Sequence, residues 1–537
     1  MDVGAVVKRL GALKSERQRM EQHWSDCYRY GCPERAHGFA GAEPDREQQR
    51  SELYDSTAAS SVQLLVSSIM SGTTPPSSVW FKAVPAGHDD DETTDNTGER
   101  WLESATNFIW RNIHASNFDS EAYEATTDGV VAGWLVLYID IDRTRGGYVF
   151  EAWPIGSCWI ASTRTDQRPD VIYREYSMTA LQCVTEYGDS CSSRVRDLAA
   201  KEPDAQVKLL RVIQPRAGAR GGDMAKNLPF ESLHIELDSK TLLLRESGYH
   251  EFPCAVARWR RVPGSVYATG QMSIALPDAK TANKLVEQTL QHGDLAIAGM
   301  WIAEDDGVLN PATVKIGPRR VITANSVDSM KALAPASNFQ LAENLLDTLR
   351  QAIRRNLMSD QLQPADGPAM TATEVHVRVD LIRQQLGPVY GRWQSEYLIP
   401  IVERCFGLAL RAGVLGQPPE ELQGQDMQIK FLSPLARAQK LEDVSAIERY
   451  MTGLSNMLQI SPEVLDNVDL DAAAQLYGKG LGVPTQIMRS ADDRSAYRDQ
   501  RAQAAQDAQQ QQQAMQLQQQ AGQAAIDTMA KNAQVTP

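Results

Sequence analysis

Residues 339–406 decide the fold of this chain. They read FQLAENLLDTLRQAIRRNLM over 339–358, SDQLQPADGPAMT over 359–371 and ATEVHVRVDLIRQQLGPVYGRWQSEYLIPIVERCF over 372–406. The first part predicts an amphipathic helix, because apolar residues recur in it at helical spacing, namely Leu341, Leu345, Leu346, Leu349 and Ile353. The second part contains two prolines and a glycine, so helix is not expected to continue through it.

The third part predicts one long helix. Thr371 and Glu374 form a capping-box pair, in which each side chain satisfies a backbone N–H of the first turn. A single apolar stripe then follows at steps of three or four residues, through Val375, Val379, Ile382, Leu386, Tyr390, Trp393, Tyr397 and Ile401. Gly387 and Pro388 predict a kink rather than an end, because the stripe keeps its phase beyond them; Pro400 is a second weak point. This arrangement indicates a mechanical part rather than a catalytic one.

The composition is that of an ordinary folded protein of several structural units. At 537 residues the chain exceeds one hydrophobic core, and about two to four units are expected. No run of apolar residues is long enough to span a membrane, and the N-terminus lacks the apolar core of a secretion signal. The seven cysteines are irregularly spaced and include no Cys-x-x-Cys pair, which predicts reduced thiols rather than disulfides or a zinc site.

The formal net charge of −14 restricts the role that nucleic acid can have. Tight non-specific binding relies on basic patches that neutralise phosphates, so a tight binder is not expected. A surface past which DNA slides is compatible with this charge, because strong phosphate contacts would slow the movement.

The rest of the chain predicts an α+β fold. Helices are expected in residues 1–35, 53–70, 99–115 and 277–298, the last beginning at Pro277. A short strand is expected at 79–81, and mostly antiparallel strands at 130–139, 148–154, 171–176, 207–213, 233–237, 241–244 and 255–259, with a hairpin turn at 238–240. Short strands at 300–303, 314–316 and 320–323 form a β-rich insert between two helices. A strand at 428–432 and helices at 437–458, 462–468, 471–478 and 484–489 follow.

The tail from about residue 490 is dominated by glutamine and alanine and has two interpretations. The first is disorder or a marginal helix, because the composition offers little apolar surface. The second is a helix that orders only when several copies bundle.

The sequence contains no recognisable catalytic, metal or cofactor site. It has no phosphate-binding loop, no His-Glu-x-x-His and no Gly-x-Ser-x-Gly motif. The acidic pairs Asp305-Asp306 and Asp140/Asp142 fall at turn-like positions, where a solvated carboxylate is expected. The best candidates for phosphate contacts are two basic pairs, with salt bridges to a neighbouring chain as the alternative, namely Arg319-Arg320 and Arg354-Arg355.

Several motifs, in their order, resemble the portal, or head-to-tail connector, family of short-tailed phages (podoviruses). The most specific is Tyr54-Asp55-Ser56-Thr57-Ala58 with the following helix and the Pro75-Pro76…Trp80-Phe81 strand. Supporting motifs are Arg17…Glu21…Trp24…Tyr28…Pro33, Ser116-Asn117-Phe118, DGVVAG at 128–133, Arg258-Trp259…Gly264…Tyr267, ALPD at 275–278 and the capped helix from Thr371. The family usually has Gly-Glu before the tyrosine and Gly-Arg after it, where this chain has Gly264-Ser265 and Ala268-Thr269.

The resemblance implies a portal fold, assembled as a dodecameric ring at one capsid vertex. Its parts would be the wing (1–270), stem helix 1 (271–298), the clip (299–338), stem helix 2 (339–358), the tunnel loop (359–371), the long kinked wing helix with its return strand (372–436), the crown (437–489) and a barrel-like or disordered tail (490–537).

The resemblance also implies a function and partners. The ring would be the channel for DNA packaging and ejection, in a virion protein made in the host cytoplasm. Partners would be further copies of the chain, double-stranded DNA, the terminase packaging motor, tail adaptor or nozzle proteins, and major capsid, scaffolding and internal core proteins. No enzyme activity or cofactor is expected. The alternative is another ring-forming virion adaptor or scaffold without a DNA-lined channel.

Two sets of residues are expected to act in such a ring. The tunnel-loop candidates for facing DNA are Ser359, Asp360, Gln361, Gln363, Asp366, Gly367 and Met370. Candidates for phosphate or intersubunit contacts are Lys315, Arg319, Arg320, Arg354 and Arg355.

Overall fold

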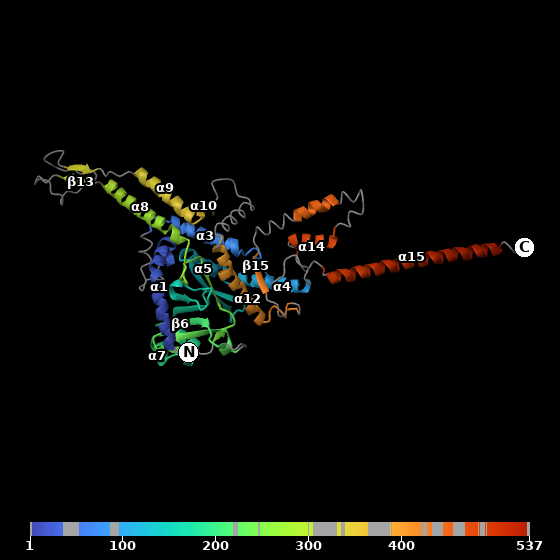
Figure 1. Cartoon of the computed structure of the whole chain (residues 1–537), viewed down its shortest axis with the longest axis horizontal. Coiled ribbons are helices and arrows are strands. Elements are labelled where there is room, and N and C mark those ends of the chain that lie inside the picture. The colour runs from blue at the N-terminus through green and yellow to red at the C-terminus, as the bar shows by residue number, and fades with distance from the viewer. Residues whose placement is uncertain are drawn as a thin grey trace. The chain divides into compact units, whose positions relative to one another are not determined.

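The computed structural model describes most of the chain and confirms a mixed α+β fold (Figure 1). The described residues are 3–35, 53–85, 96–218, 224–244, 247–298, 300–303, 330–333, 339–362, 387, 389–419, 422, 427–431, 444–454, 468–481, 483, 489 and 491–533. The chain divides into two compact units, one of residues 1–79 and 109–414 and one of residues 80–108 and 415–537.

The first unit contains a larger antiparallel sheet covered by helices on both faces. Its strand order is β4-β5-β6-β7-β8, with β9 also paired to β7. The strands are β4 (Cys158–Ala161), β5 (Val171–Thr179), β6 (Gln206–Pro215), β7 (Phe230–Glu236), β8 (Thr241–Leu244) and β9 (Gly248–Tyr249). The predicted hairpin turn at 238–240 is confirmed between β7 and β8, where Lys240 takes a φ of 54°.

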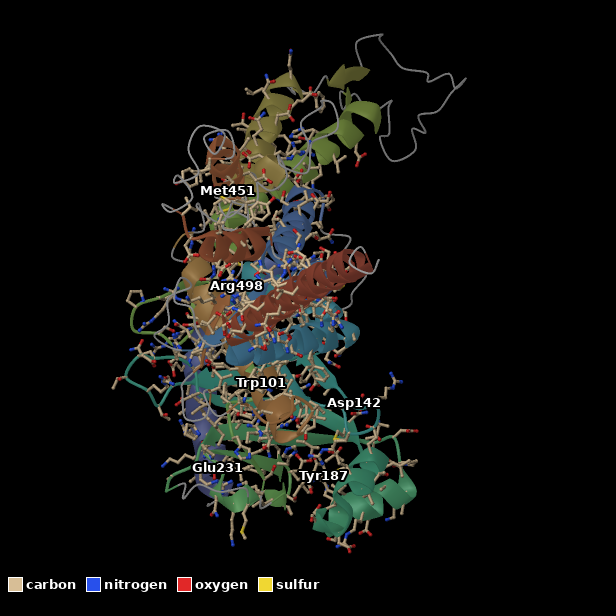
Figure 2. All side chains as sticks on the ribbon, turned by 90° about the vertical axis from the view of Figure 1, so that its right-hand side faces the viewer. Trp101, Asp142, Tyr187, Glu231, Met451 and Arg498 are labelled. Carbon is tan, nitrogen blue, oxygen red and sulfur yellow. The ribbon has the colours of Figure 1, made fainter. Side chains whose placement is uncertain are left out.

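The alternation of side chains along β6 explains why helices cover both faces. Leu210 and Val212 pack on one face with α1 (Val3–Gly31), whereas Val207 and Leu209 pack on the other with α6 (Ala180–Tyr187) and α7 (Ser193–Lys201). In Figure 2, Glu231 of β7 lies on the side of α1 and Tyr187 of α6 on the opposite side.

The same unit contains a smaller sheet, ordered β10-β2-β3. β2 (Trp134–Ile141) lies between β10 (Cys254–Arg258) and β3 (Tyr148–Ala152), and its first six residues are all buried. Helices α3 (Thr57–Thr73), α5 (Phe118–Val131) and α12 (Ile399–Arg411) belong to the same unit, and α5 and α12 pack against β2. Short 3-10 turns at Ile155–Ser157, Gly188–Ser190 and Ala225–Asn227 connect its elements.

Two predicted boundaries near β2 and α8 were wrong. Val130 and Val131 end α5 rather than begin a strand, because a continuous apolar run does not distinguish a buried helix end from a strand. Gly133 separates the two elements at a φ of 99°, where a Cβ atom would lie 2.2 Å from the Thr269 backbone carbon. Helix α8 (Met272–Ala298) starts before Pro277, because burial of Met272 and its apolar neighbours favours the additional turn.

The second unit is built around one pair of strands. β1 (Phe81–Pro85) pairs antiparallel with β15 (Met427–Phe431), and the rings of Trp80 and Phe431 stack at 6.2 Å. The strand predicted at 428–432 is thus confirmed, and the strand predicted at 79–81 begins at Phe81. Helix α4 (Asn96–Ala115) starts in this unit, where the Trp101 indole donates to the carbonyl of Leu415 at 3.1 Å (Figure 2).

Most of the described residues in the C-terminal part of the second unit are helical. Residues 444–454 are helical, within the helix predicted at 437–458. Helix α14 (Leu470–Leu481) is joined to α15 (Ala491–Ala533) by the Asp471 carboxylate, which lies 2.7 Å from a guanidinium nitrogen of Arg498. The glutamine-rich tail is therefore a helix over its described length. The helices predicted at 462–468 and 484–489 lie outside the described residues apart from their last positions.

Candidate functional site

The first helix of the stretch 339–406 forms a helical hairpin with an earlier helix of the first unit. Helix α8 and helix α9 (Phe339–Asn356) pack against each other, and antiparallel strands β13 (Met300–Ala303) and β14 (Met330–Leu333) lie at the far end of the hairpin (Figure 1). The predicted strand at 300–303 is confirmed. The strands predicted at 314–316 and 320–323 lie outside the described residues.

The motif at 54–57 anchors both helices of the hairpin. The side-chain oxygen of Asn283 in α8 accepts hydrogen bonds from the backbone N–H groups of Tyr54 at 2.7 Å and Asp55 at 3.2 Å. The Asp55 carboxylate accepts one from Arg350 in α9 at 2.8 Å. Burial alone would raise the pKa of Asp55, but the bonds from Thr57 and Arg350 outweigh burial and hold the pKa below its ordinary value.

Further polar contacts join the base of the hairpin to the segment before it. The Gln271 amide donates to the Asn356 carbonyl at 2.6 Å, and the Asn356 amide donates to Asp278 at 3.0 Å. Ile353 and Leu357 are fully buried here. The base of the hairpin is therefore fixed within the subunit by both polar and apolar contacts.

The apolar stripe of α9 has a different environment at its other end. Leu341 is 65% exposed and Leu345 is 48% exposed, and on α8 Leu290 is 53% exposed. The helical spacing predicted for 339–358 is confirmed, but only the end of the stripe near Ile353 is buried within one chain. Exposed large apolar side chains on two helices that pack together are typical of a surface that another protein covers.

The chain after α9 begins as helix rather than as a loop. Helix α10 (Ser359–Leu362) contains Ser359, Asp360 and Gln361. The Ser359 hydroxyl is buried and donates to the hydroxyl of Ser61 in α3 at 2.9 Å, whereas Asp360 is exposed. Residues 359–362 of the predicted loop at 359–371 are thus helical, because Ser359 packs against α3. The other tunnel-loop candidates, Gln363, Asp366, Gly367 and Met370, lie outside the described residues.

The predicted contact residues are only partly described. Arg354 and Arg355 lie in the last turn of α9 and are both exposed, whereas Lys315, Arg319 and Arg320 lie outside the described residues. Gly387 has a φ of 33°, which L side chains rarely adopt, and its neighbour Pro388 lies outside the described residues. The kink predicted there stays a prediction.

The helix that follows Gly387 contains a π-helical turn at Gln394–Leu398, where the N–H of Ile399 donates to the carbonyl of Gln394. Pro400 follows directly and has no N–H, so ordinary helical bonding is already interrupted at this point. The sequence indicated the weak point at Pro400 but not the type of turn.

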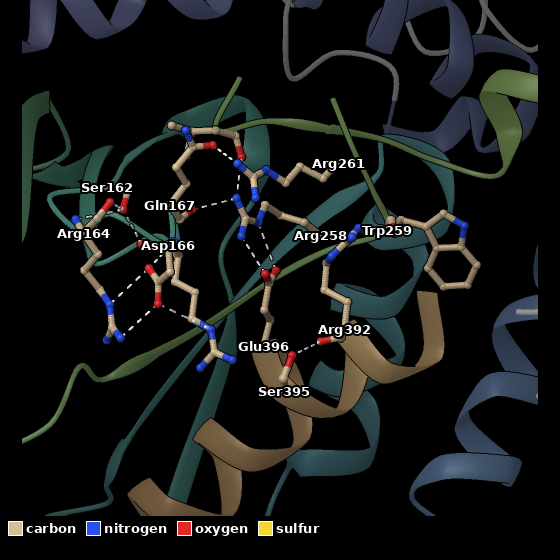
Figure 3. Close-up of polar contacts among 12 residues, drawn as sticks. Ser162, Arg164, Asp166, Gln167, Arg258, Trp259, Arg261, Arg392, Ser395 and Glu396 are labelled. Carbon is tan, nitrogen blue, oxygen red and sulfur yellow. Dashed lines mark hydrogen bonds and ion pairs between the residues drawn. The ribbon is translucent and has the colours of Figure 1, made fainter. Parts of the chain in front are cut away.

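The π-helical turn presents a buried carboxylate to a buried arginine. Glu396 and Arg258 form two bonds, Nη2 to Oε1 at 2.6 Å and Nε to Oε2 at 3.0 Å (Figure 3). Arg258 Nη1 also donates to the carbonyls of Gln167 at 2.8 Å and Val266 at 3.4 Å. One guanidinium therefore joins three segments, and a charge removed from this pair would leave the other charge buried without compensation.

Trp259 connects this junction to the base of the hairpin. Its carbonyl accepts a bond from Arg392 at 3.2 Å (Figure 3). Its indole N–H donates to Gln271 at 3.2 Å. Its ring packs edge-on against Trp393, whose side chain is buried. The predicted core position of Trp393 agrees with this burial. Apart from the Arg258-Trp259 motif, no local pattern predicts this network, because its members are far apart along the chain.

The part of the chain that the structure describes shows no grouping of histidine, cysteine or carboxylate side chains suited to a metal ion. Within the same residues, no helix combines the length and apolar character needed to cross a membrane.

Comparison with known proteins defines the class. A family model described as bacteriophage head to tail connecting protein matches residues 4–488, and the chain belongs to this family. A probable portal protein of Bordetella phage BPP-1 is 28% identical over 526 residues, which cover 93% of this chain and 90% of that protein. The portal protein of Salmonella phage epsilon15 is 28% identical over 514 residues, with the same two coverages. The resemblance seen in the motifs is therefore confirmed.

Proposed function

We propose that this chain is the portal subunit of a short-tailed phage, assembled as a dodecameric ring at one capsid vertex. The ring serves as the channel for DNA packaging and ejection. Membership of the head-to-tail connecting family and the names of both relatives support the portal role. The terminase motor, tail adaptor, capsid and scaffolding proteins would dock on the ring.

The observation that carries the ring assembly is the exposed apolar face of the hairpin. Leu341 and Leu345 of α9 and Leu290 of α8 are about half or more exposed in the single chain. Burying such side chains stabilises an interface by about 1.5–3 kcal/mol for each one fully covered. A closed ring repeats one head-to-tail contact, so each hairpin would cover the face of its neighbour.

The hairpin is anchored firmly enough to serve as a rigid element of such a ring. Asp55, Asn283 and Arg350 fix its base, so the apolar face is held in a defined orientation. In the proposed channel, the candidates for facing DNA are Asp360 and Gln361 of α10, together with Gln363, Asp366, Gly367 and Met370. A net charge of −14 per subunit would keep contacts with DNA weak.

Substitution of the apolar face tests the ring proposal. The variant Leu341→Asp/Leu345→Asp should lower the fraction of protein in rings at least tenfold in light scattering, because two charges would be buried between subunits. The matched control is Leu181→Asp, since Leu181 is 54% exposed on α6, away from the hairpin. The proposal fails if the hairpin variant forms rings as readily as the control.

A further inference from the structure

Four exposed arginines lie on two segments that meet beside the Arg258–Glu396 junction. Arg164 and Arg168 lie on the loop between β4 and β5, and Arg260 and Arg261 form β11 (Arg260–Arg261), which pairs with β12 (Ala268–Thr269). All four side chains are exposed. We call Arg164, Arg168, Arg260 and Arg261 the arginine platform.

The two segments are held together by contacts that run through Gln167. The Gln167 side-chain oxygen accepts a hydrogen bond from Arg261, and its carbonyl accepts one from the buried Arg258 at 2.8 Å (Figure 3). Gln167 takes a φ of 58°, a conformation that costs free energy for a residue with a side chain. These contacts therefore hold the loop between β4 and β5 in one conformation.

Hydrogen bonds within the loop fix the positions of its arginines. The Ser162 hydroxyl donates to the Arg168 carbonyl at 2.6 Å, and the Arg168 N–H donates to Asp166 at 3.0 Å. The backbone N–H of Thr163 donates to the buried Asp170 at 2.8 Å. Little conformational freedom remains to be lost in this backbone when a ligand binds.

Nearby carboxylates neutralise only part of the positive charge of the arginine platform. Asp166 lies 3.0 Å from Arg164 and 4.0 Å from Arg168, so one exposed carboxylate is shared between two arginines. Glu403 lies close enough to Arg168 to interact with it electrostatically. Glu396 is already neutralised by Arg258. A surface with excess positive charge on a chain of net charge −14 indicates a local anion-binding role.

The chemistry of the platform favours a nucleic-acid backbone over a protein surface. Arginine binds phosphate through paired N–H groups, and all four cations of the platform are arginine rather than lysine. Stable protein interfaces have an apolar centre. Among the described residues, no large apolar side chain within 161–170 or 258–269 is exposed.

We propose that the arginine platform binds the phosphate backbone of double-stranded DNA. The choice of DNA among polyanions rests on the proposed portal function. Contacts to phosphate carry no sequence information, so the proposed binding is independent of sequence. Each guanidinium contacts one phosphate, and the remaining surface of the acidic chain repels DNA and limits the contact to this site.

Binding of a fluorescein-labelled 30-base-pair duplex to the full-length protein tests the inference, by fluorescence anisotropy at several salt concentrations. The variants are Arg164→Gln/Arg168→Gln and Arg260→Gln/Arg261→Gln. The matched control is Arg143→Gln/Arg145→Gln, which removes two exposed arginines from the turn between β2 and β3. Each platform variant should lower the slope of log K against log salt concentration by about 1.8, and the control should leave it unchanged.

Three outcomes overturn the inference. These are unchanged DNA binding by both platform variants, an equal loss in the control, and displacement of the duplex by polyglutamate as readily as by unlabelled DNA. Light scattering on the same samples separates this inference from the proposed function. If rings form but DNA binding does not depend on the platform, only the inference is overturned. If the protein forms no rings even with its scaffolding protein present, the portal proposal is overturned.

Discussion

The guanidinium of Arg350 donates a hydrogen bond of 2.8 Å to the carboxylate of Asp55, across 295 residues of sequence. Asp55 belongs to the motif most specific to the family, and Arg350 lies on α9, whose distal face is exposed and apolar. The contact therefore fixes the orientation of the surface that we propose for ring assembly. Because Asp55 is buried, the pair lies in an environment where a lost partner is costly.

Asp55→Asn should lower the free energy of unfolding by about 1–3 kcal/mol, because it removes the charged acceptor and leaves Arg350 without its partner. Part of the effect is screened by solvent, since Arg350 is partly exposed. Urea unfolding measures the change. The control is Asp238→Asn, which breaks an exposed pair with Arg194 and should cost at most about 0.5 kcal/mol. Equal effects of the two variants would contradict the anchoring role.

His234 should make stability depend on pH. Burial, together with nearby Arg211, lowers the pKa of His234 from 6.5 to about 3. Between pH 6.5 and about pH 3, the unfolded state therefore binds one more proton than the folded state. The free energy of unfolding consequently decreases as the pH falls through this range. Stability should decrease by about 1.4 kcal/mol per pH unit from His234 below pH 6.5. Urea unfolding of wild type and His234→Asn at several pH values should show a shallower dependence in the variant; parallel curves would be contrary to this account.

Trp393→Ala should destabilise the first unit by roughly 3–5 kcal/mol, because the ring is buried against Trp259 and Tyr397. Thermal and urea unfolding measure the loss. Trp393→Phe keeps most of the apolar volume and should cost clearly less. A melting temperature unchanged by the alanine variant would remove Trp393 from the core.

Gly129→Ala should lower the free energy of unfolding by about 1–3 kcal/mol. The reason is that the added Cβ atom would lie 3.2 Å from both Leu135 and the Trp393 ring. Gly11→Ala, in the exposed part of α1, meets no atom within 4 Å and should stabilise by up to about 1 kcal/mol. Chemical denaturation of both variants tests the prediction, and the same sign of change in the two would refute it.

Shortening the predicted tunnel loop within residues 363–370 should leave ring assembly intact and impair packaging or retention of DNA. The deletion starts after α10, so the contact between Ser359 and Ser61 is preserved. Packaged DNA in purified particles measures the effect, with ring mass as the control. Normal packaging and retention by the shortened protein would show that this loop has another role.

The regular features of the fold could be predicted from the sequence because they follow from local periodicity. The helical spacing from Leu341 to Ile353 and the turn at 238–240 are examples, and both are present. Errors occurred where local signals are ambiguous. Val130 and Val131 lie in an apolar run that fits helix and strand equally well, and tertiary packing of Met272 extended α8 beyond the expected start at Pro277.

The long-range parts of the site could not be read from one sequence. Arg258 and Glu396 are separated by 138 residues, and the arginine platform joins a loop and a short strand about ninety residues apart. In both cases, neither segment has a local sequence pattern that predicts which other segment it contacts. The burial of Ser359 is a similar case, since it depends on Ser61 of α3.

The most direct test of the portal account is the mass and symmetry of the full-length protein, measured by light scattering and by class averages from negative-stain images, alone and with its scaffolding protein. The account predicts rings with a central channel and a mass of about 712 kDa, that of a dodecamer of 59.3 kDa subunits. A chain that stays monomeric even with scaffolding protein present would contradict it.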